Sequence, residues 1–385
     1  MQGLIDSTLR EGMQAVGVDL SLKRRVELAA ALVAMGVEEI ELGPVRAGDD
    51  ELARLVAGCR RQAGASRLAI WCRCRAEDID QALALAPEVL ALSMPVSPVL
   101  LRTKLQRNQR QVEELVAAAL ARARGRVSCL ALGLEDATRA EPRFLAELVE
   151  LARRQGVDRI RLADTVGVAT PAELVELVGR VRRQAGSRIA IGVHTHNDFG
   201  MAAANAIAAL EAGADWADVS LLGLGERAGL ARLEEVAGFL ALRRQRPYRL
   251  TGLPQLCAGL AREIGRGVAP HSPVVGSEIF ACETGLHLAA LAVDPASYEP
   301  FAPELVGGKR NLLYGIKVGR RAIDRQWRRW RTCQGVEPER LCADRSRLPE
   351  EVAPAGLVAR VRQAARELRR PLTCEELQGV FLGQV

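Results

Sequence analysis

Two histidines stand one residue apart in the segment HTHND at 194–198, and few other features of the sequence are as chemically specific. The chain has four histidines, so half of them lie here. Residues two apart on a β-strand point to the same side, so the imidazoles of His194 and His196 can face one site. Two imidazoles and a carboxylate are typical of a divalent-metal centre with open coordination positions. The alternative is a pair of capping histidines at a strand end.

A carboxylate for such a centre can come from the segment LIDSTLREGMQ at 4–14. Asp6 and Glu11 are its acids, and Arg10 places a cation beside Glu11. Glu11 alone would be interpreted as an exposed loop acid. It becomes a candidate ligand if the fold brings it to the two histidines.

Two further segments have both a chemical and a structural interpretation. In GLGERAG at 223–229, the glycines let backbone N–H groups approach an anion such as a phosphate, or they form a plain tight turn. His287, in ETGLH, is by itself interpreted as a structural histidine.

A regular alternation of short apolar segments and helix-like segments must position these residues. Eight segments have the composition of strands: 3–6, 37–43, 67–73, 89–95, 126–135, 158–164, 188–194 and 216–222. Strands that alternate with helices predict a parallel sheet, and eight such units within about 245 residues predict a closed (β/α)₈ TIM barrel over residues 1–250. A doubly wound open sheet is the competing fold, but no G-x-G-x-x-G motif follows the first strand.

The carboxyl ends of barrel strands carry the reacting groups in such folds. Polar side chains follow six of the eight predicted strands, which a purely structural barrel does not require. They are Asp6, Thr8, Arg10, Glu11, Arg73, Ser93, Arg102, Glu135, Asp136, Asp164, Thr165, His194 and His196.

The alternation stops after about residue 250. Residues 251–312 are richer in glycine and proline and predict an irregular linker subdomain, which contains His287 and Tyr298. Residues 313–385 predict a C-terminal helical subdomain, in which 355–370 is strongly amphipathic.

Composition limits the classes of partner. The net charge of +6 comes almost entirely from arginine, since the chain has four lysines, and we interpret it as a compositional bias and not as a nucleic-acid surface. The basic run at 320–331 predicts a solvated helix face or a site for an anion such as a CoA nucleotide. Nine cysteines without a regular framework, no signal-like start and no apolar run of about 18 residues predict a cytoplasmic protein that does not enter a membrane.

Seven motifs, in this order and spacing, resemble the homocitrate synthases, which group with the isopropylmalate synthases among the barrel metalloenzymes named for a D-R-E motif on strand one. The motifs are LIDSTLREG, LEDATR, LADTVG, HTHNDFG, LGLGERAG, ETGLH and SYEPFAPELVG. The resemblance runs from residue 2 to about 320, and the helical tail is similar as well.

The resemblance implies a role for each matching residue. Glu11, His194 and His196 match the ligands of a divalent metal (Mg, Mn or Zn), and Arg10 matches the arginine that offsets the developing oxyanion. Gln14 and Thr165 match substrate contacts. The family's acid–base pair corresponds to Glu135 and His287, and Tyr298 matches a tyrosine that closes the site. In the family, the residues that match His287 and Tyr298 come from the neighbouring subunit, so the resemblance implies a domain-swapped homodimer.

The implied reaction joins acetyl-CoA to a 2-oxo acid and then hydrolyses the thioester. A 2-oxoglutarate site needs a cation for the distal carboxylate, and Arg102 falls near the arginine that has this role in lysine-pathway homocitrate synthases. Oxaloacetate, pyruvate and 2-oxoisovalerate are the alternative oxo acids. A catalytically weak regulatory paralogue and a two-His-one-carboxylate iron oxygenase are the alternative functions.

Four positions depart from the family pattern. Met13 stands where a second acid is usual, and Cys282 stands where a histidine is usual. Leu222 and Leu230 replace the asparagines that often flank the glycine-rich turn. None of these changes removes a group assigned to metal binding or proton transfer.

Overall fold

The computed structural model describes residues 1–46, 48, 50–332 and 353–383, so 333–352 and 384–385 of the predicted helical region lie outside the described residues. The chain forms two compact units. The barrel unit comprises Met1–Leu250 and Cys257–Gly267, and the C-terminal unit comprises Thr251–Leu256 and Val268–Val385. The sequence-based boundaries after residues 250 and 312 divide the chain three ways, whereas the contacts group it in these two units.

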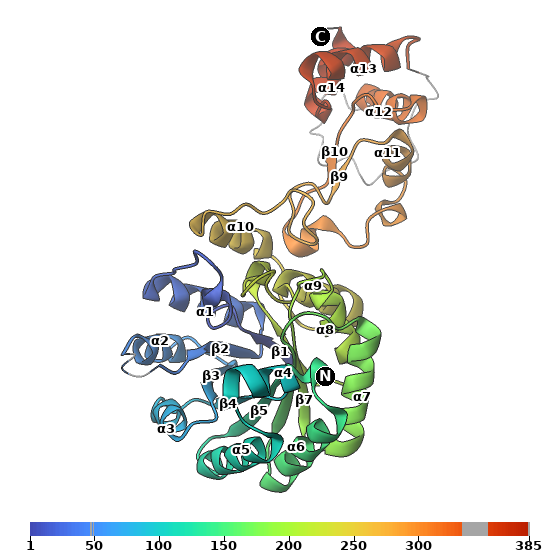
Figure 1. Ribbon diagram of the computed structural model, residues 1–385. Helices are drawn as coiled ribbons and strands as arrows, with labels where there is room; N and C mark the ends of the chain where they lie inside the picture. Colours follow the sequence, from blue (N-terminus) through green and yellow to red (C-terminus); the bar gives the residue numbers. More distant parts are fainter. Residues whose placement is uncertain (47, 49, 333–352, 384–385) are drawn as a thin grey trace. The chain divides into compact units, whose positions relative to one another are not determined.

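The barrel unit contains a closed barrel of parallel strands in sequential order, and β1 pairs with both β2 and β8 (Figure 1). The strands are β1 (Gly3–Asp6), β2 (Glu39–Pro44), β3 (Arg67–Arg73), β4 (Val89–Pro95), β5 (Cys129–Glu135), β6 (Arg159–Asp164), β7 (Ala190–Thr195) and β8 (Trp216–Val219). The predicted (β/α)₈ barrel is therefore confirmed, and the strands lie within a few residues of the predicted segments.

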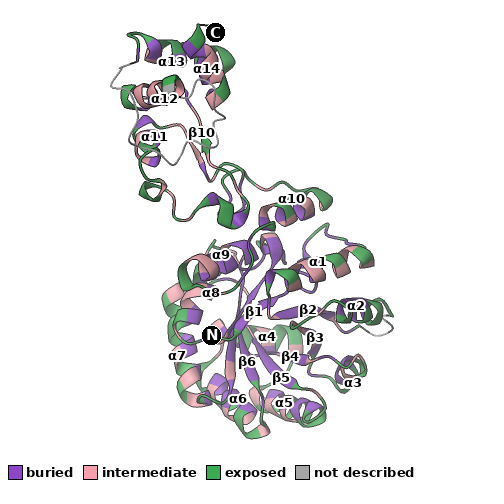
Figure 2. Cartoon of the chain, turned by 180° about the vertical axis from the view of Figure 1, so that it is seen from behind, coloured by how far each residue is buried: buried purple, intermediate pink, exposed green. Residues whose placement is uncertain are grey.

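Helices surround the barrel, with their apolar sides on the strands and their polar sides exposed (Figure 2). The principal ones are α1 (Leu22–Met35), α2 (Asp50–Arg60), α3 (Ala76–Ala84), α5 (Gln109–Ala123), α6 (Pro142–Gln155), α7 (Pro171–Ala185), α8 (Ala202–Glu211) and α9 (Leu233–Arg244). Sequence signals set their ends. In α7, Thr170 and Glu173 form a capping box around Pro171 at the first position. Helix α1 ends at Gly36, whose φ of 91° is left-handed.

Charged side chains cross the interior at the amino ends of the strands. Arg159 of β6 is 2% exposed and donates to Glu39 of β2 from both terminal nitrogens, at 3.1 and 2.5 Å. Arg67 donates to the same carboxylate at 2.9 Å. The guanidinium groups of Arg159 and Arg67 lie over the ring of Trp216, 5.0 and 4.7 Å from its centroid. These ion-paired side chains fill the barrel interior at the amino ends of the strands.

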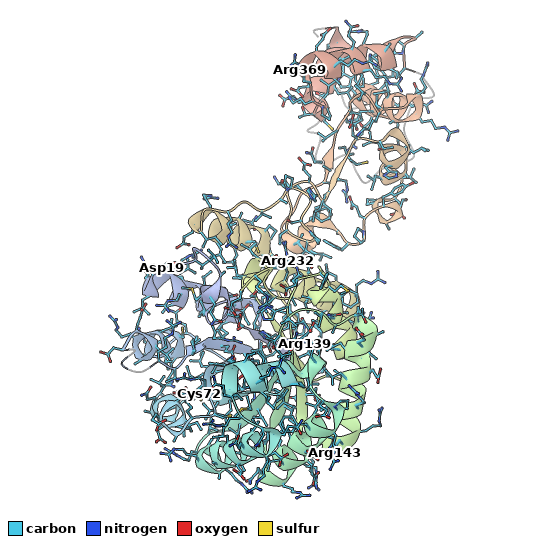
Figure 3. The ribbon with its side chains drawn as sticks, viewed as in Figure 1. Asp19, Cys72, Arg139, Arg143, Arg232 and Arg369 are labelled. Atoms are coloured by element: carbon cyan, nitrogen blue, oxygen red, sulfur yellow. The ribbon has the colours of Figure 1, made fainter. Side chains whose placement is uncertain are left out.

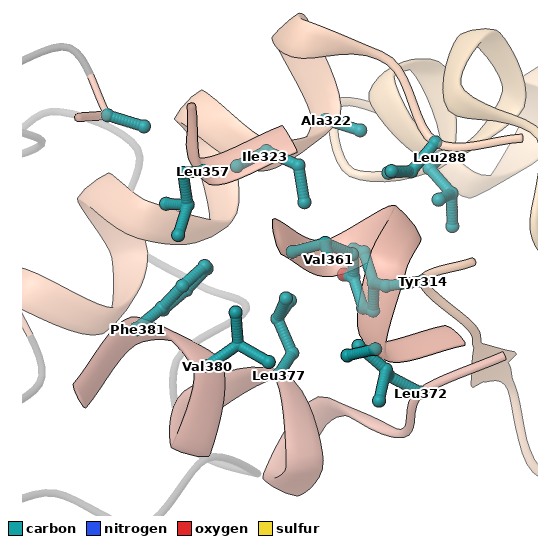
Figure 4. Packing of buried hydrophobic residues seen from close by; sticks show 13 residues of the cluster. Leu288, Tyr314, Ala322, Ile323, Leu357, Val361, Leu372, Leu377, Val380 and Phe381 are labelled. Atoms are coloured by element: carbon teal, nitrogen blue, oxygen red, sulfur yellow. The ribbon is translucent and has the colours of Figure 1, made fainter. Parts of the chain in front are cut away.

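The C-terminal unit has its own apolar core (Figure 4). Its elements include β9 (Ala281–Cys282), β10 (Asn311–Leu312), α11 (Gly285–Leu291), α12 (Arg320–Thr332), α13 (Leu357–Leu368) and α14 (Cys374–Leu382). The basic helix α12 packs Trp327 and Trp330 against Phe381, with ring centroids 5.3 and 5.7 Å from that of Phe381. Among the residues described, no helix is long and apolar enough to cross a membrane.

Candidate active site

A cavity of about 160 Å³ lies at the carboxyl ends of the barrel strands. It brings together most of the residues that the sequence singled out, although they are up to 186 positions apart from Arg10 to His196. The predicted residues that line it are Arg10, Glu11, Gln14, Ser93, Glu135, Thr165, His194 and His196.

The two histidines face each other, with 3.3 Å between their Nε2 atoms, and both are buried. His194 Nδ1 lies 2.7 Å from Asp218 Oδ2. We assign the imidazole proton to Nδ1, where it can be donated to this carboxylate, so Nε2 of His194 presents a lone pair to the cavity. Burial, then the neighbouring His194, lowers the pKa of His196 to about 2, which keeps that imidazole neutral.

Glu11 lies at the same cavity, buried, and forms an ion pair with Arg10 through Oε2. Among the described residues, its Oε1 has no hydrogen-bond partner, and neither has Nδ1 of His196. Two imidazoles and one carboxylate with a spare oxygen fit a divalent ion in donor type. Within the described residues, however, no three His, Cys, Asp or Glu side chains enclose a common point. The donors share a cavity, and Glu11 is oriented toward Arg10.

Glu41 of β2 fixes the guanidinium group of Arg10 through a hydrogen bond. Arg10 Nε donates to Glu41 Oε2 at 2.6 Å, and Ser7 Oγ donates to the same oxygen at 2.8 Å. Burial alone would raise the pKa of Glu41, but Arg10 and Arg161 outweigh it and keep that pKa below its usual range. Glu41 is therefore ionised, and it fixes the Arg10 guanidinium at the cavity wall.

Asp6 and Thr8 bind backbone groups. Asp6 Oδ1 accepts the Thr8 N–H at 2.9 Å, and Thr8 Oγ1 accepts the Leu221 N–H at 2.8 Å. Asp6 is fully buried, and burial raises its pKa to about 7. Asp6 is absent from the cavity lining, so of the two acids considered from the sequence, Glu11 is the one at the cavity.

A short π-helix after β4, Leu101–Leu105, directs two cations to different places. Lys104 lines the cavity and donates to Glu135 at 2.7 and 2.9 Å. Arg102, the residue expected to meet the distal carboxylate, is exposed and lines a separate surface depression with Arg107 and Arg110. Single π-helical turns are common at functional sites, and here the turn places Lys104, and not Arg102, in the cavity lining.

Thr165, after β6, links two strand ends. Its Oγ1 accepts the Asp136 N–H at 2.8 Å, which leaves the hydroxyl proton available to donate into the cavity. Asp136 is fully buried and pairs with Arg139, which is labelled in Figure 3. The turn after β5 is thus fixed beside Glu135.

The glycine-rich turn after β8 is tightly closed. Gly229 has a φ of 82°, and a β-carbon there would collide with the Gly223 carbonyl oxygen, so only glycine fits. Arg227 lines the cavity, donates to both oxygens of Asp198 at 3.0 Å, and donates to the Thr165 carbonyl at 2.5 Å. The turn therefore joins the loops that follow β6, β7 and β8.

His287 and Tyr298 belong to the C-terminal unit. Their rings stack with centroids 3.8 Å apart and planes inclined by 24°. Tyr298 is half-exposed. The structure thus pairs the two residues with each other, and their predicted catalytic roles stay predictions.

Known proteins share both the sequence pattern and the barrel of this chain. The profile of the HMGL-like family matches residues 2–257, and a homocitrate synthase post-HMGL domain-like profile matches residues 274–334. The chain belongs to the HMGL-like family. The homocitrate synthases among the relatives confirm the predicted family and the acyltransferase class of enzyme. The alternative of an iron oxygenase is therefore abandoned.

Two relatives of this HMGL-like chain are matched over nearly their whole length. A homocitrate synthase of Frankia alni is 37% identical over 322 residues, covering 83% of this chain and 90% of the relative. A 2-isopropylmalate synthase of Caldanaerobacter subterraneus subsp. tengcongensis is 31% identical, covering 98% and 94%. The solved hydroxymethylglutaryl-CoA lyase of Pseudomonas aeruginosa has a TM-score of 0.62 at 20% identity, covering 71% and 96%, and shares the fold.

The departures from the family pattern have different structural settings. Leu222 has a φ of 59°, a left-handed conformation that suits the asparagine usual in the family better than leucine. Met13 is half-buried in a 3₁₀ turn, Gly12–Gln14. Cys282 is half-buried in β9, with its Sγ 4.0 Å from the Thr284 carbonyl oxygen.

Six charged groups at the site were not predicted from the sequence: Glu41, Lys104, Arg161, Asp218, Glu226 and Arg227. Three of them lie inside strands and point into the barrel. A signal was present in β6, where Arg159 and Arg161 alternate with Ile160 and Leu162. Charged residues at the inward positions of a buried strand require partners inside the barrel.

Proposed function

We propose that the chain is a homocitrate synthase, which condenses acetyl-CoA with 2-oxoglutarate and hydrolyses the resulting thioester. The homocitrate synthase and isopropylmalate synthase relatives support the condensation, and the cavity supports the choice of oxo acid. Its walls carry four cationic side chains: Arg10, Lys104, Arg161 and Arg227. Polar walls suit a substrate with two carboxylates, whereas 2-oxoisovalerate needs apolar walls for its branched end. This lining is the observation that carries the proposal.

The substrate is bound at both ends. Thr165 donates its hydroxyl proton to the carboxylate next to the oxo group, and Gln14 lies at the cavity edge for a further contact. Lys104, with its ammonium group paired to Glu135, is the cation for the distal carboxylate. Arg102, predicted for that role from the sequence, remains the competing candidate.

Catalysis uses Glu135 and Arg10 of the cavity lining together with His287 and Tyr298 of the C-terminal unit. Glu135, with His287 as the second member of the acid–base pair, removes a proton from the acetyl methyl group, and the enolate carbon then attacks the oxo carbonyl. Arg10 offsets the negative charge that develops on the carbonyl oxygen, a contribution of about 3 kcal/mol for one such donor. Tyr298 closes the site, and water then attacks the thioester carbonyl to release CoA.

Glu11, His194 and His196 would hold the divalent metal that the family implies. When bound there, it polarises the oxo carbonyl as a Lewis acid. The neutral state of His196 and the unpartnered oxygen of Glu11 support this ligand set. The expected domain-swapped homodimer and cytoplasmic location belong to the same proposal.

One assay separates the candidate functions. Thiol release from acetyl-CoA is measured with 2-oxoglutarate, oxaloacetate, pyruvate and 2-oxoisovalerate, each with Mg²⁺ or Mn²⁺. We expect the highest kcat/KM with 2-oxoglutarate, and no turnover with any metal after His194→Ala. A preference for another oxo acid would overturn the substrate, and no thiol release with any of them would favour a regulatory paralogue.

A further inference from the structure

One guanidinium group in the barrel interior connects the two walls of the site. Arg161 of β6 is 5% exposed. Its Nη2 donates to Glu41 Oε1 at 2.8 Å, and its Nη1 donates to Asp218 Oδ2 at 2.8 Å. Glu41 in turn accepts from Arg10 Nε, and Asp218 accepts from His194 Nδ1. A continuous chain of buried contacts therefore runs from Arg10 to His194.

The fold leaves space for this guanidinium group by placing glycine on both sides of it. In the strand register, Arg161 pairs with Gly133 of β5 and with Gly192 of β7. A β-carbon on Gly133 would lie 3.9 Å from Arg161 Nε, and one on Gly192 would lie 3.7 Å from Arg161 Cγ. A longer side chain at either position would compete with Arg161 for the barrel interior. The row Gly133–Arg161–Gly192 thus permits a long side chain to extend across the barrel.

We propose that Arg161 is a positioning residue, which fixes Arg10 through Glu41 and His194 through Asp218 at the same time. The two carboxylates are fully buried and would repel each other without the cation between them. With it, the oxyanion-stabilising arginine and one proposed metal ligand share a single rigid support. A guanidinium group suits this task because its planar fork donates to two carboxylates in fixed directions, whereas a lysine ammonium is a point charge.

The adjacent layer provides a matched control. Arg159 lies two residues earlier on the same side of β6, is equally buried, and also crosses to β2. Its carboxylate partner is Glu39, which, within the described part of the chain, also binds Arg67 and no residue of the cavity lining. Arg159→Lys therefore perturbs a buried ion pair between the same two strands without removing a hydrogen bond of the proposed support.

The inference rests on the proposed function, and its test includes a measurement that is independent of turnover. Arg161→Lys and Arg159→Lys are each checked for folding by thermal unfolding, and the Kd for Mn²⁺ is then measured by calorimetry on the full chain. Steady-state kcat and KM for acetyl-CoA and 2-oxoglutarate are measured on the same samples. Lysine keeps the buried positive charge, which favours folding of both variants.

We expect Arg161→Lys to weaken Mn²⁺ binding at least tenfold and to lower kcat at least tenfold, with a smaller change in KM. Arg159→Lys should leave Kd and kcat within threefold of wild type. Equal losses in both variants, or an Arg161→Lys variant within threefold of wild type, would overturn the inference, as would wild-type protein that binds no Mn²⁺. If only the proposed function is wrong, the result would be different. Arg161→Lys would still bind Mn²⁺ more weakly than Arg159→Lys, but no oxo acid would give thiol release from acetyl-CoA.

Discussion

Asp218 Oδ2 lies 2.7 Å from His194 Nδ1 and determines which imidazole nitrogen faces the cavity. Asp218 is fully buried at the middle of β8, so this contact is shielded from water. Carboxylates that hydrogen-bond a metal-ligating histidine orient its ring and raise its basicity. The relationship makes Asp218 as relevant to the proposed metal site as the ligands themselves.

Asp218→Asn should therefore weaken divalent-metal binding by about 10- to 100-fold, because the amide holds the imidazole less firmly than the carboxylate. Calorimetric titration with Mn²⁺ measures the change. Asp136→Asn is the control, since Asp136 is equally buried and pairs with Arg139. An unchanged Kd in Asp218→Asn would remove Asp218 from the support of the site.

Lys104→Met should raise the KM for 2-oxoglutarate by roughly 10- to 100-fold, the effect of losing one charge-assisted hydrogen bond of about 1.5–3 kcal/mol. Arg102→Met is the matched variant, because both residues lie in the same π-helical turn and only Lys104 lines the cavity. Steady-state kinetics decide between them. A higher KM in Arg102→Met alone would restore the assignment made from the sequence.

Asp6 makes the stability of the barrel depend on pH. Burial raises its pKa from 3.8 to about 7, so between these values the folded state retains a proton that the unfolded state releases. This contribution is complete below the unfolded pKa and is lost as the pH rises through 7, at up to about 1.4 kcal/mol per pH unit. Asp6→Asn should therefore lose less stability between pH 5 and pH 8 than wild type, as measured by urea unfolding. The same pH slope in Asp6→Asn and in the exposed Asp19→Asn would contradict this account.

Gly229→Ala should destabilise the barrel unit by about 2 kcal/mol or more, because the new β-carbon would collide with the Gly223 carbonyl oxygen. Gly17→Ala is the control for the cost of the backbone conformation alone. Gly17 has a φ of 76°, but a β-carbon there would meet no atom within 4 Å. It should cost about 1 kcal/mol, the usual penalty for a left-handed alanine. Equal losses in thermal unfolding would show that the close approach contributes nothing.

The proposed swapped dimer predicts complementation between inactive variants. Co-expressed Glu11→Gln and His287→Ala chains, with different tags, should regain about a quarter of wild-type activity by random association, because one site in each mixed dimer would be intact. Glu11→Gln with His194→Ala is the control, since both changes lie in the barrel unit and leave no intact site. Activity that stays at the background level of this control would argue against the swap.

The barrel and the segments that form its site follow from the order of residues along the chain. Alternating apolar and helix-like segments specify which residues are strands, because each strand must bury its side chains against helices. The carboxyl ends of parallel strands converge, so the sequence was sufficient to place Arg10, Glu11, Glu135, Thr165, His194 and His196 at one mouth. The close approach of the two imidazoles follows from their spacing of two residues, with His194 in β7 and His196 directly after its end.

The pairing of charges inside the barrel, by contrast, depends on the tertiary structure. Glu41, Arg161 and Asp218 come from strands far apart in the chain, and they meet because of how the strands are arranged around the closed barrel. The π-helical turn likewise decides that Lys104, and not Arg102, lines the cavity, because side chains two residues apart on a helix point to nearly opposite sides of it. The spacing of residues along the chain determines which way a side chain points within its own helix or strand. The partners of that side chain on other elements are determined by packing in three dimensions.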